Sequence, residues 1–278
     1  MTKLLSRIRS ERVSDGSNGN VERTLESPHG QPVTARLAAA ASRRADLESL
    51  LGAAPPDAAP EQLRRLVVEQ NVAGKGSAIS RQKLWHQLKE RYLLDRSVSE
   101  AAAFLAGFGA TSSPSDGGLL CLLMMARTDR LFREVTLRAV SPSLTRDGVP
   151  VLADQVQQVL EAYLQEHGLV WSRDTMEHVR QHMLASLKDF GVLRGSKFKR
   201  TARPRPGSQV TLLAARLALL EGLTPRQVLD SQWFRLLGID AGQAVDLLYS
   251  AAREGVLQFR MQAEVVELQV PDPIVGET

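Results

Sequence analysis

The sequence predicts a mainly α-helical protein, a helical bundle with winged-helix-like units and two short β-hairpins. Apolar residues recur at helical spacing along most of the 278 residues, as Leu84, Leu88 and Tyr92 do on one helix face. Capping residues precede many of these segments and glycines follow them, whereas alternating, strand-like stretches are few. Hydrophobic residues make up 43% of the chain, which is in the globular range, so most of it is expected to fold.

The N-terminal part begins with a segment that has few apolar anchors. Residues 1–30 are expected to form a flexible arm, because Ser, Gly and Asn cluster at 14–20. Folded structure is expected from near residue 31, where residues 32–37 lead into an Ala-rich helix that ends at Gly52. A proline-rich turn follows, and Pro60 is well placed to start a helix over 61–69. After a glycine-bearing turn, either Ser77 or Ser80 is expected to cap a helix over 81–94.

The middle of the chain is expected to hold buried helices. Residues 99–107 and 119–127 are strongly apolar, and a loop rich in Ser, Pro and Gly separates them at 111–118. The second helix is expected to continue to Leu137, and Pro142 and Pro150 bracket the next loop. These segments complete a predicted N-terminal helical domain over 31–150, which includes a helix-turn-helix-like segment.

A C-terminal helical domain is predicted over 151–278, beginning with an amphipathic helix over 153–166. One order of elements occurs twice in it, over 172–202 and over 240–268: a capped helix, a glycine stop, a short strand, a turn and a second short strand. This order resembles a winged helix, in which a recognition helix precedes a two-stranded wing. Further helices are expected between the two units, over 210–221 and 225–229.

The basic residues of the chain are concentrated in the first of these wings. The formal net charge is only +4 and the pI is about 9.4, which is compatible with a polyanionic partner. Residues 194–205 hold six cations and no acid: Arg194, Lys197, Lys199, Arg200, Arg203 and Arg205. Six like charges this close repel one another unless a polyanion or solvent compensates them, and phosphates would do so with release of counterions. The segment therefore predicts nucleic-acid contact; the alternative is a solvated basic hairpin.

A second basic segment lies at the start of the helix over 81–94. Here a Gly-Lys-Gly turn centred on Lys75 meets a helix N-terminus, whose free N–H groups can hold a phosphate. Ser80 adds a donor, and Arg81 and Lys83 add charge. The turn is not a full phosphate loop, because Glu69 stands where the first glycine of that pattern would be. DNA contact and a plain capped surface helix both remain open for this segment.

The wing of the second unit has a different charge pattern. Arg260 is accompanied there by Glu264 and Glu267, so this wing is expected to pack or to contact protein rather than phosphate.

No catalytic centre, cofactor site or metal site is predicted. The lone thiol of Cys121 lies in an apolar run and is expected to be buried and inert. His178 and His182 have a spacing that can hold a metal, but no third ligand is suggested nearby, so surface or groove-facing histidines are expected. No signal peptide and no apolar stretch long enough to cross a membrane is found. Together with the single cysteine, this predicts a cytoplasmic protein.

Several segments resemble the BrxA family, a small component of bacteriophage exclusion (BREX) defence systems. The resemblance runs in order over roughly residues 33–270, and its third part is the most telling. The segments are VEQN at 68–71 with SAISR at 77–81 and LKERY at 88–92; DRLFRE at 129–134; and WSRDT at 171–175 with LASLKDFGVL at 184–193 and Lys199. The resemblance implies a non-enzymatic helical protein that binds DNA, with a fold like an antitermination factor of the NusB type combined with helix-turn-helix-like parts. It also implies BREX partners: an adenine-specific DNA methyltransferase, a large ATPase and a phosphatase-like protein.

Three functions follow as hypotheses. The first is a non-catalytic subunit that binds double-stranded DNA in a phage-defence complex, through contacts at Lys75, Ser80, Arg81, Lys83, Arg194, Lys197, Lys199 and Arg200. The second is a protein-interaction scaffold of the same complex, with the basic wing against acidic partner surfaces. The third is an RNA-binding regulator that resembles an antitermination factor.

Overall fold

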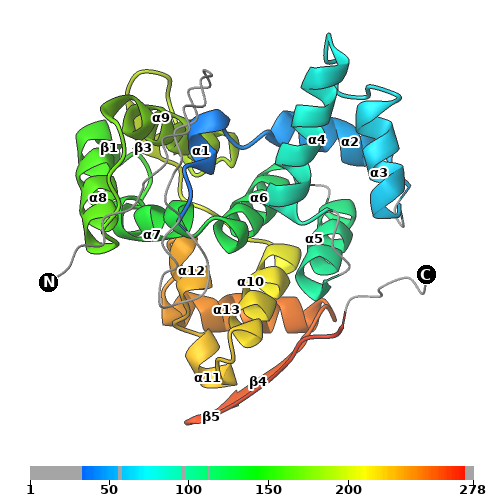
Figure 1. Ribbon diagram of the computed structural model, residues 1–278. Helices are drawn as coiled ribbons and strands as arrows, with labels where there is room; N and C mark the ends of the chain where they lie inside the picture. Colours follow the sequence, from blue (N-terminus) through cyan, green and yellow to red (C-terminus); the bar gives the residue numbers. More distant parts are fainter. Residues whose placement is uncertain (1–32, 56–57, 95–97, 112, 273–278) are drawn as a thin grey trace, which may run out of the picture.

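The computed structural model describes residues 33–55, 58–94, 98–111 and 113–272 and is mainly helical, with two small antiparallel sheets, as the sequence predicts. The predicted arm, 1–30, lies outside the described residues. Figure 1 shows the arrangement. The helices are α1 (Arg36–Ala39), α2 (Arg44–Ala53), α3 (Pro60–Val68), α4 (Ala78–Tyr92), α5 (Ser99–Ala110), α6 (Pro114–Thr128), α7 (Arg130–Ala139), α8 (Ala153–Glu166), α9 (Arg173–Asp189), α10 (Ser208–Leu220), α11 (Pro225–Val228), α12 (Gln232–Leu236) and α13 (Ala241–Arg253), with a 3₁₀ turn at Ser141–Ser143. The strands are β1 (Pro150–Val151), β2 (Leu193–Arg194), β3 (Lys199–Thr201), β4 (Gln258–Gln262) and β5 (Val265–Gln269).

Helix α6 is the centre of the core. Every residue from Gly117 to Ala126 is buried, and the helix packs against α4, α5, α7 and α10. The prediction of a loop up to residue 118 is wrong, because Ser113 caps the helix and Pro114 occupies its first turn. Glycine is needed at residue 118, where a Cβ would press on the carbonyl oxygen of Phe190.

Two expected long helices are each broken in two. Asp129 adopts an extended conformation and its side chain caps α7, so the helix expected to run from 119 to 137 ends at Thr128. The Ala-rich helix expected to end at Gly52 is split into α1 and α2 by an extended Ala40 and a left-handed Arg43. The backbone between them is held by α4, since Arg91 Nη2 donates to the carbonyl of Ala40 at 2.6 Å. Buried side chains of α4 thus satisfy carbonyls that a continuous helix would have paired within itself.

The first predicted hairpin is present and belongs to a three-stranded sheet. Strands β2 and β3 pair antiparallel, with Arg194 opposite Arg200. Strand β1 was not predicted; it lies in the segment expected to be a loop and pairs with β3 through Pro150 opposite Arg200. The strand order is therefore β1-β3-β2.

The C-terminal part continues into the same core. Helix α10 packs on α5 and α6, and α13 packs on α10. Capping boxes at Thr224 and Asp240 begin α11 and α13, as the sequence predicts for these two helices. The short helix α12 was not predicted. The hairpin of β4 and β5 has Arg260 opposite Glu267.

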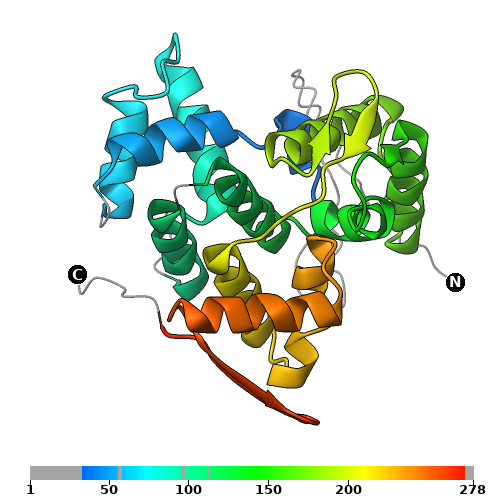
Figure 2. The same ribbon diagram turned by 180° about the vertical axis from the view of Figure 1, so that it is seen from behind.

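The capped helix, glycine stop and hairpin order is confirmed in both predicted units, whereas their winged-helix role and the domain division at residue 150 stay predictions. In the described part of the chain, no helix is both long and apolar enough to cross a membrane. Figures 1 and 2 place the β4–β5 hairpin at the lower end of the molecule and the β2–β3 hairpin in its upper half.

Candidate nucleic-acid interface

The basic hairpin, defined as residues 193–201, has a turn whose shape is fixed from within. Gly195 has a φ of 95°, and a Cβ there would collide with the carbonyl oxygen of Phe198. Lys199 Nζ donates to the carbonyls of Gly195 at 2.9 Å and Ser196 at 2.8 Å. Partial burial lowers the pKa of Lys199, and the nearby Lys188 adds to this while Asp189 opposes it. Of the predicted contact residues, Lys199 is thus the one that holds the turn.

Two arginines face each other across the strands of this hairpin. Arg194 stands opposite Arg200, and like charges directly opposite are unfavourable in a sheet. Arg200 Nη1 donates to the carbonyl of Gly148 at 3.0 Å. Arg194 Nη2 lies 3.6 Å from Asp147 Oδ2, with 57% and 60% of the two side chains exposed. An exposed pair of this kind offsets little of the repulsion.

Asp147 was missed by sequence reasoning because it precedes the basic segment by almost fifty residues. Its Oδ1 also accepts the backbone N–H of Arg203 at 2.8 Å. Asp147 therefore brings a carboxylate to the Arg194 and Arg203 side of a segment that contains none of its own.

The tip of the hairpin presents an aromatic ring and a cation to solvent. Phe198 is 76% exposed, and Lys197 Nζ lies 5.7 Å from the centre of its ring. Lys197 and Arg205 are both exposed, and neither forms an ion pair with another described residue. Phe198 did not enter the predicted site, although an aromatic residue inside a basic turn is a signal of nucleic-acid binding.

The second predicted segment is more strongly tied to its own chain. Ser77, not Ser80, is the N-cap of α4 and accepts the N–H of Ser80 at 3.1 Å. Lys75 Nζ is 2.7 Å from Asp46 Oδ1. Arg81 Nε donates to the carbonyl of Val68 at 2.8 Å. Ser80 and Lys83 are the predicted contact residues that remain exposed here.

The two basic segments lie on the same end of the molecule without touching. Figures 1 and 2 both place the start of α4 and the turn of the basic hairpin at the upper end, on either side of α1. A ligand that contacted both would have to extend across α1.

A groove of about 590 Å³ opens beneath the hairpin tip. It runs between residues 196–200, the start of α8 and the middle of α9. Leu152, which is 56% exposed, and Leu184 give it an apolar floor, and Asp154 and Gln181 stand among its polar residues. Arg180, also in its wall, is held by Glu177 through Nη2 and Oε1 at 2.5 Å.

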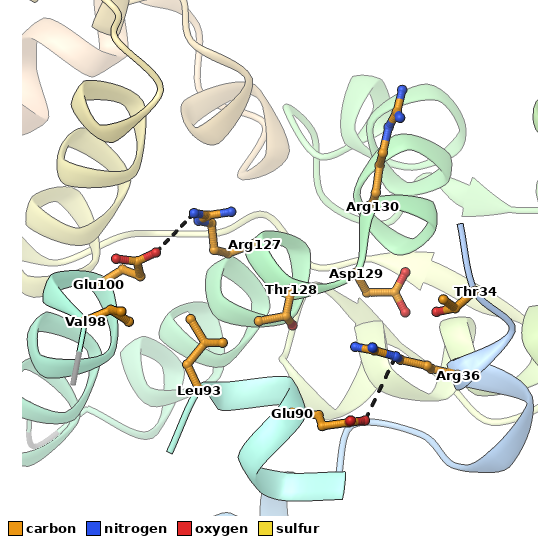
Figure 3. Close-up of a pocket in the computed structure, with 10 residues that line it drawn as sticks. All are labelled: Thr34, Arg36, Glu90, Leu93, Val98, Glu100, Arg127, Thr128, Asp129 and Arg130. Atoms are coloured by element: carbon orange, nitrogen blue, oxygen red, sulfur yellow. Dashed lines mark hydrogen bonds and ion pairs between the residues drawn. The ribbon is translucent and has the colours of Figure 1, made fainter. Parts of the chain in front are cut away.

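A separate pocket of about 250 Å³ lies where α1, α4 and α5 meet the junction of α6 and α7 (Figure 3). Its charges compensate one another: Arg127 Nη2 is 3.1 Å from Glu100 Oε1, and Arg36 Nε is 3.9 Å from Glu90 Oε2. Asp129, at the α6–α7 junction, accepts the N–H of Phe132 at 2.9 Å, and burial raises its pKa.

The DRLFRE segment that carries part of the family resemblance therefore has a structural role. Asp129 starts α7, Leu131 and Phe132 are fully buried, and the guanidinium of Arg133 lies 5.5 Å from the centre of the Trp233 ring. These residues join α7 to α12.

The side chains considered for chemistry are engaged in packing. Cys121 is buried as predicted, and burial raises its pKa to about 12. His182 Nδ1 lies 2.6 Å from the carbonyl oxygen of Leu37, and its ring stacks on that of His178 with centres 6.4 Å apart. Within the described ranges, no three His, Cys, Asp or Glu side chains are grouped so as to hold a metal ion.

Comparison with known proteins gives one family match. The model of the family described as BrxA matches residues 34–215, which include both basic segments and end within α10. No curated protein and no solved structure matches the chain.

Proposed function

Since the chain belongs to the BrxA family and is thereby a BREX-associated protein, we propose that it is a non-catalytic accessory subunit that binds double-stranded DNA in a phage-defence complex. The binding surface is the upper end of the molecule, with the basic hairpin as its main contact and the start of α4 as a second one.

The observation that carries this proposal is the electrostatic state of the basic hairpin. Arg194 and Arg200 stand opposite each other across the strands. Lys197 in the turn, and Arg205 just beyond the hairpin, are exposed without an ion-pair partner among the described residues. Asp147 is the carboxylate beside them. Phosphates at this position would relieve the repulsion, and the release of condensed counterions from DNA would favour binding.

The order of elements around the hairpin supports a winged helix. Helix α7, strand β1, helices α8 and α9 and the β2–β3 hairpin follow one another, and β1 adds a third strand beside β3. In such a unit α9 is the recognition helix and the hairpin is the wing. One face of α9 is covered by α1, and Gln181 and Lys188 are exposed on the rest of the helix.

The start of α4 supports a longer footprint. Ser80 and Lys83 are exposed in the first turns of this helix, where the dipole favours phosphate. Lys75 and Arg81 contribute their charge from fixed positions, because Asp46 and the carbonyl of Val68 hold them.

The test is a titration of duplex DNA at two salt concentrations, followed by fluorescence anisotropy. We expect binding that weakens steeply between about 50 and 200 mM salt. Absence of duplex binding at the lower concentration, or binding that ignores salt, would overturn the proposal. Competition with structured RNA separates the RNA-binding alternative, because a regulator of RNA would release the duplex to it.

The alternative function, a protein-interaction scaffold, is supported by the C-terminal β4–β5 hairpin. The β4–β5 hairpin has an exposed Val265 (64%) next to Glu264, which pairs with Arg226 at 2.6 Å. An apolar residue among acidic side chains suits a protein partner better than phosphate. Such a partner would be the methyltransferase, the ATPase or the phosphatase-like protein. A Val265→Lys variant is expected to lose that partner in a pull-down while it keeps duplex binding.

A further inference from the structure

We propose that Phe198 is a base-stacking residue, and that the groove beneath it takes an unpaired nucleobase from a locally opened or gapped strand. This inference rests on the proposed function, because it names what the DNA-binding hairpin does beyond holding phosphates.

The first support is the position of the ring. Phe198 lies at the tip of the basic hairpin with 76% of its surface exposed, whereas the other six phenylalanines, at positions 104, 108, 132, 190, 234 and 259, are buried or half-buried. An aromatic ring with this exposure is accessible for stacking against a ligand. The partner must approach from outside, since the turn points away from the core.

The second support is that the backbone of the turn that carries the ring has a fixed shape before any ligand arrives. Gly195 adopts a conformation that a side chain would block, and the ammonium of Lys199 bonds to two carbonyls of the turn. A fixed turn loses little conformational freedom on binding, so its aromatic residue can serve as a stacking platform.

The third support is the charge around the ring. Lys197 Nζ lies 5.7 Å from the ring centre, and Arg194 and Arg200 are exposed on the strands below. An aromatic ring framed by cations is the arrangement that binds single-stranded nucleic acid, where bases stack and the backbone follows the charges. A purely acidic partner would have no flat ring to stack on Phe198, and a neutral apolar partner would have no negative charge for the surrounding cations.

The fourth support is the groove itself. Its volume of about 590 Å³ is in the range of about 300–1,000 Å³ that holds small organic ligands. Phe198 forms one wall, and Leu152 and Leu184 line the floor. Asp154 and Gln181 offer hydrogen-bonding groups to the edge of a base that stacks there. A base inserted beside the ring would cover both Phe198 and the exposed Leu152.

The test uses the full chain with a duplex and with the same duplex carrying a short single-stranded gap, whose central base is 2-aminopurine. Stacking on Phe198 is expected to quench the 2-aminopurine fluorescence and to make the gapped DNA the tighter ligand. Replacement by Phe198→Ala is expected to weaken gapped DNA roughly 5-fold to 150-fold, the loss of one base–aromatic stack. Binding of the intact duplex should stay close to that of the wild type.

Variants of matched size separate stacking from simple hydrophobic contact. Phe198→Trp should keep the quenching and the preference for gapped DNA, whereas Phe198→Leu should lose both. Tyr249→Leu, which removes an exposed aromatic ring from α13 at the other end of the molecule, should change neither.

Each opposite result overturns the inference in a recognisable way. If the wild type binds the duplex in a salt-dependent manner but shows no preference for the gap, or if Phe198→Leu behaves as wild type, base stacking is wrong and the proposed function stands. If neither DNA binds at low salt, the proposed function fails as well.

Discussion

Removal of two wing charges, by Lys197→Ala with Arg200→Ala, should lower the salt dependence of DNA binding by an amount that can be calculated. Each phosphate contact contributes about 0.9 to the slope of log K against log salt, so two contacts contribute about 1.8. Between about 50 and 200 mM salt, the wild type should therefore lose about 12-fold more affinity than the variant does.

Lys199 is left unchanged in this variant because of its structural role. Lys199 Nζ holds the turn through Gly195 and Ser196, so its removal would change the shape of the hairpin as well as its charge. Lys197 has no hydrogen-bond acceptor within the described chain, and Arg200 loses only its bond to the carbonyl of Gly148. The double variant should consequently melt close to the temperature of the wild type.

A matched control removes two exposed arginines from the lower half of the molecule, by Arg235→Ala with Arg253→Ala. These residues lie on α12 and α13 and give the same change in net charge. Binding is followed by fluorescence anisotropy on one duplex over a series of salt concentrations. If both variants lower the slope equally, or if the wing variant leaves it unchanged, the assignment of phosphate contacts to the hairpin is refuted.

Further predictions concern the core that positions the hairpin. Asp129→Ala should cost about 1 kcal/mol of unfolding free energy in urea denaturation at pH 7 through loss of the α7 cap, whereas Asp129→Asn keeps the cap. Because burial raises the pKa of Asp129, the wild type should lose stability relative to the Asn variant as pH rises from the ordinary carboxyl pKa of the unfolded chain toward the raised pKa of the folded protein; parallel pH curves would contradict this. Cys121, whose pKa is raised from 9.0 to about 12 by burial, should resist iodoacetamide at neutral pH until urea unfolds the chain; labelling of the native protein would refute this. Stability should fall as pH rises from about 9 toward 12, because the unfolded chain ionises this thiol in that range while the folded protein keeps it protonated. Gly118→Ala should destabilise by about 1–3 kcal/mol, seen as a lower melting temperature, because the new Cβ meets the carbonyl of Phe190.

The sequence predicts best those elements whose signals are local. Caps and apolar periodicity place α3, α4, α8, α9 and α13 to within a few residues. The break between α1 and α2 could not be predicted, because Arg91 of α4 stabilises it from fifty residues away. Strand β1 could not be predicted for the same reason, since its two residues pair with β3 across a similar separation in the sequence.

The same distinction holds for the candidate interface. The sequence shows where the cations are, and the structure shows which acceptors they meet. Asp46 holds Lys75, the carbonyl of Val68 holds Arg81, and Asp147 lies beside Arg194. All three partners come from other parts of the chain, so no local pattern reveals them. Phe198 is different, because its place inside a basic turn is visible in the sequence.

The two hairpins differ in how completely their charges are balanced within the chain. In the C-terminal hairpin Arg260 stands opposite Glu267, an attractive cross-strand pair. In the basic hairpin the equivalent pair is Arg194 opposite Arg200, which is repulsive, and the carboxylate that pairs with Arg194, that of Asp147, is well exposed and 3.6 Å away. A fold that retains such a pair gives up stability in the free protein, and an anionic ligand recovers it on binding. The two units share one local order of elements, so the proposal that the basic hairpin, and not the C-terminal one, binds DNA rests on the charge pattern and not on the order of elements.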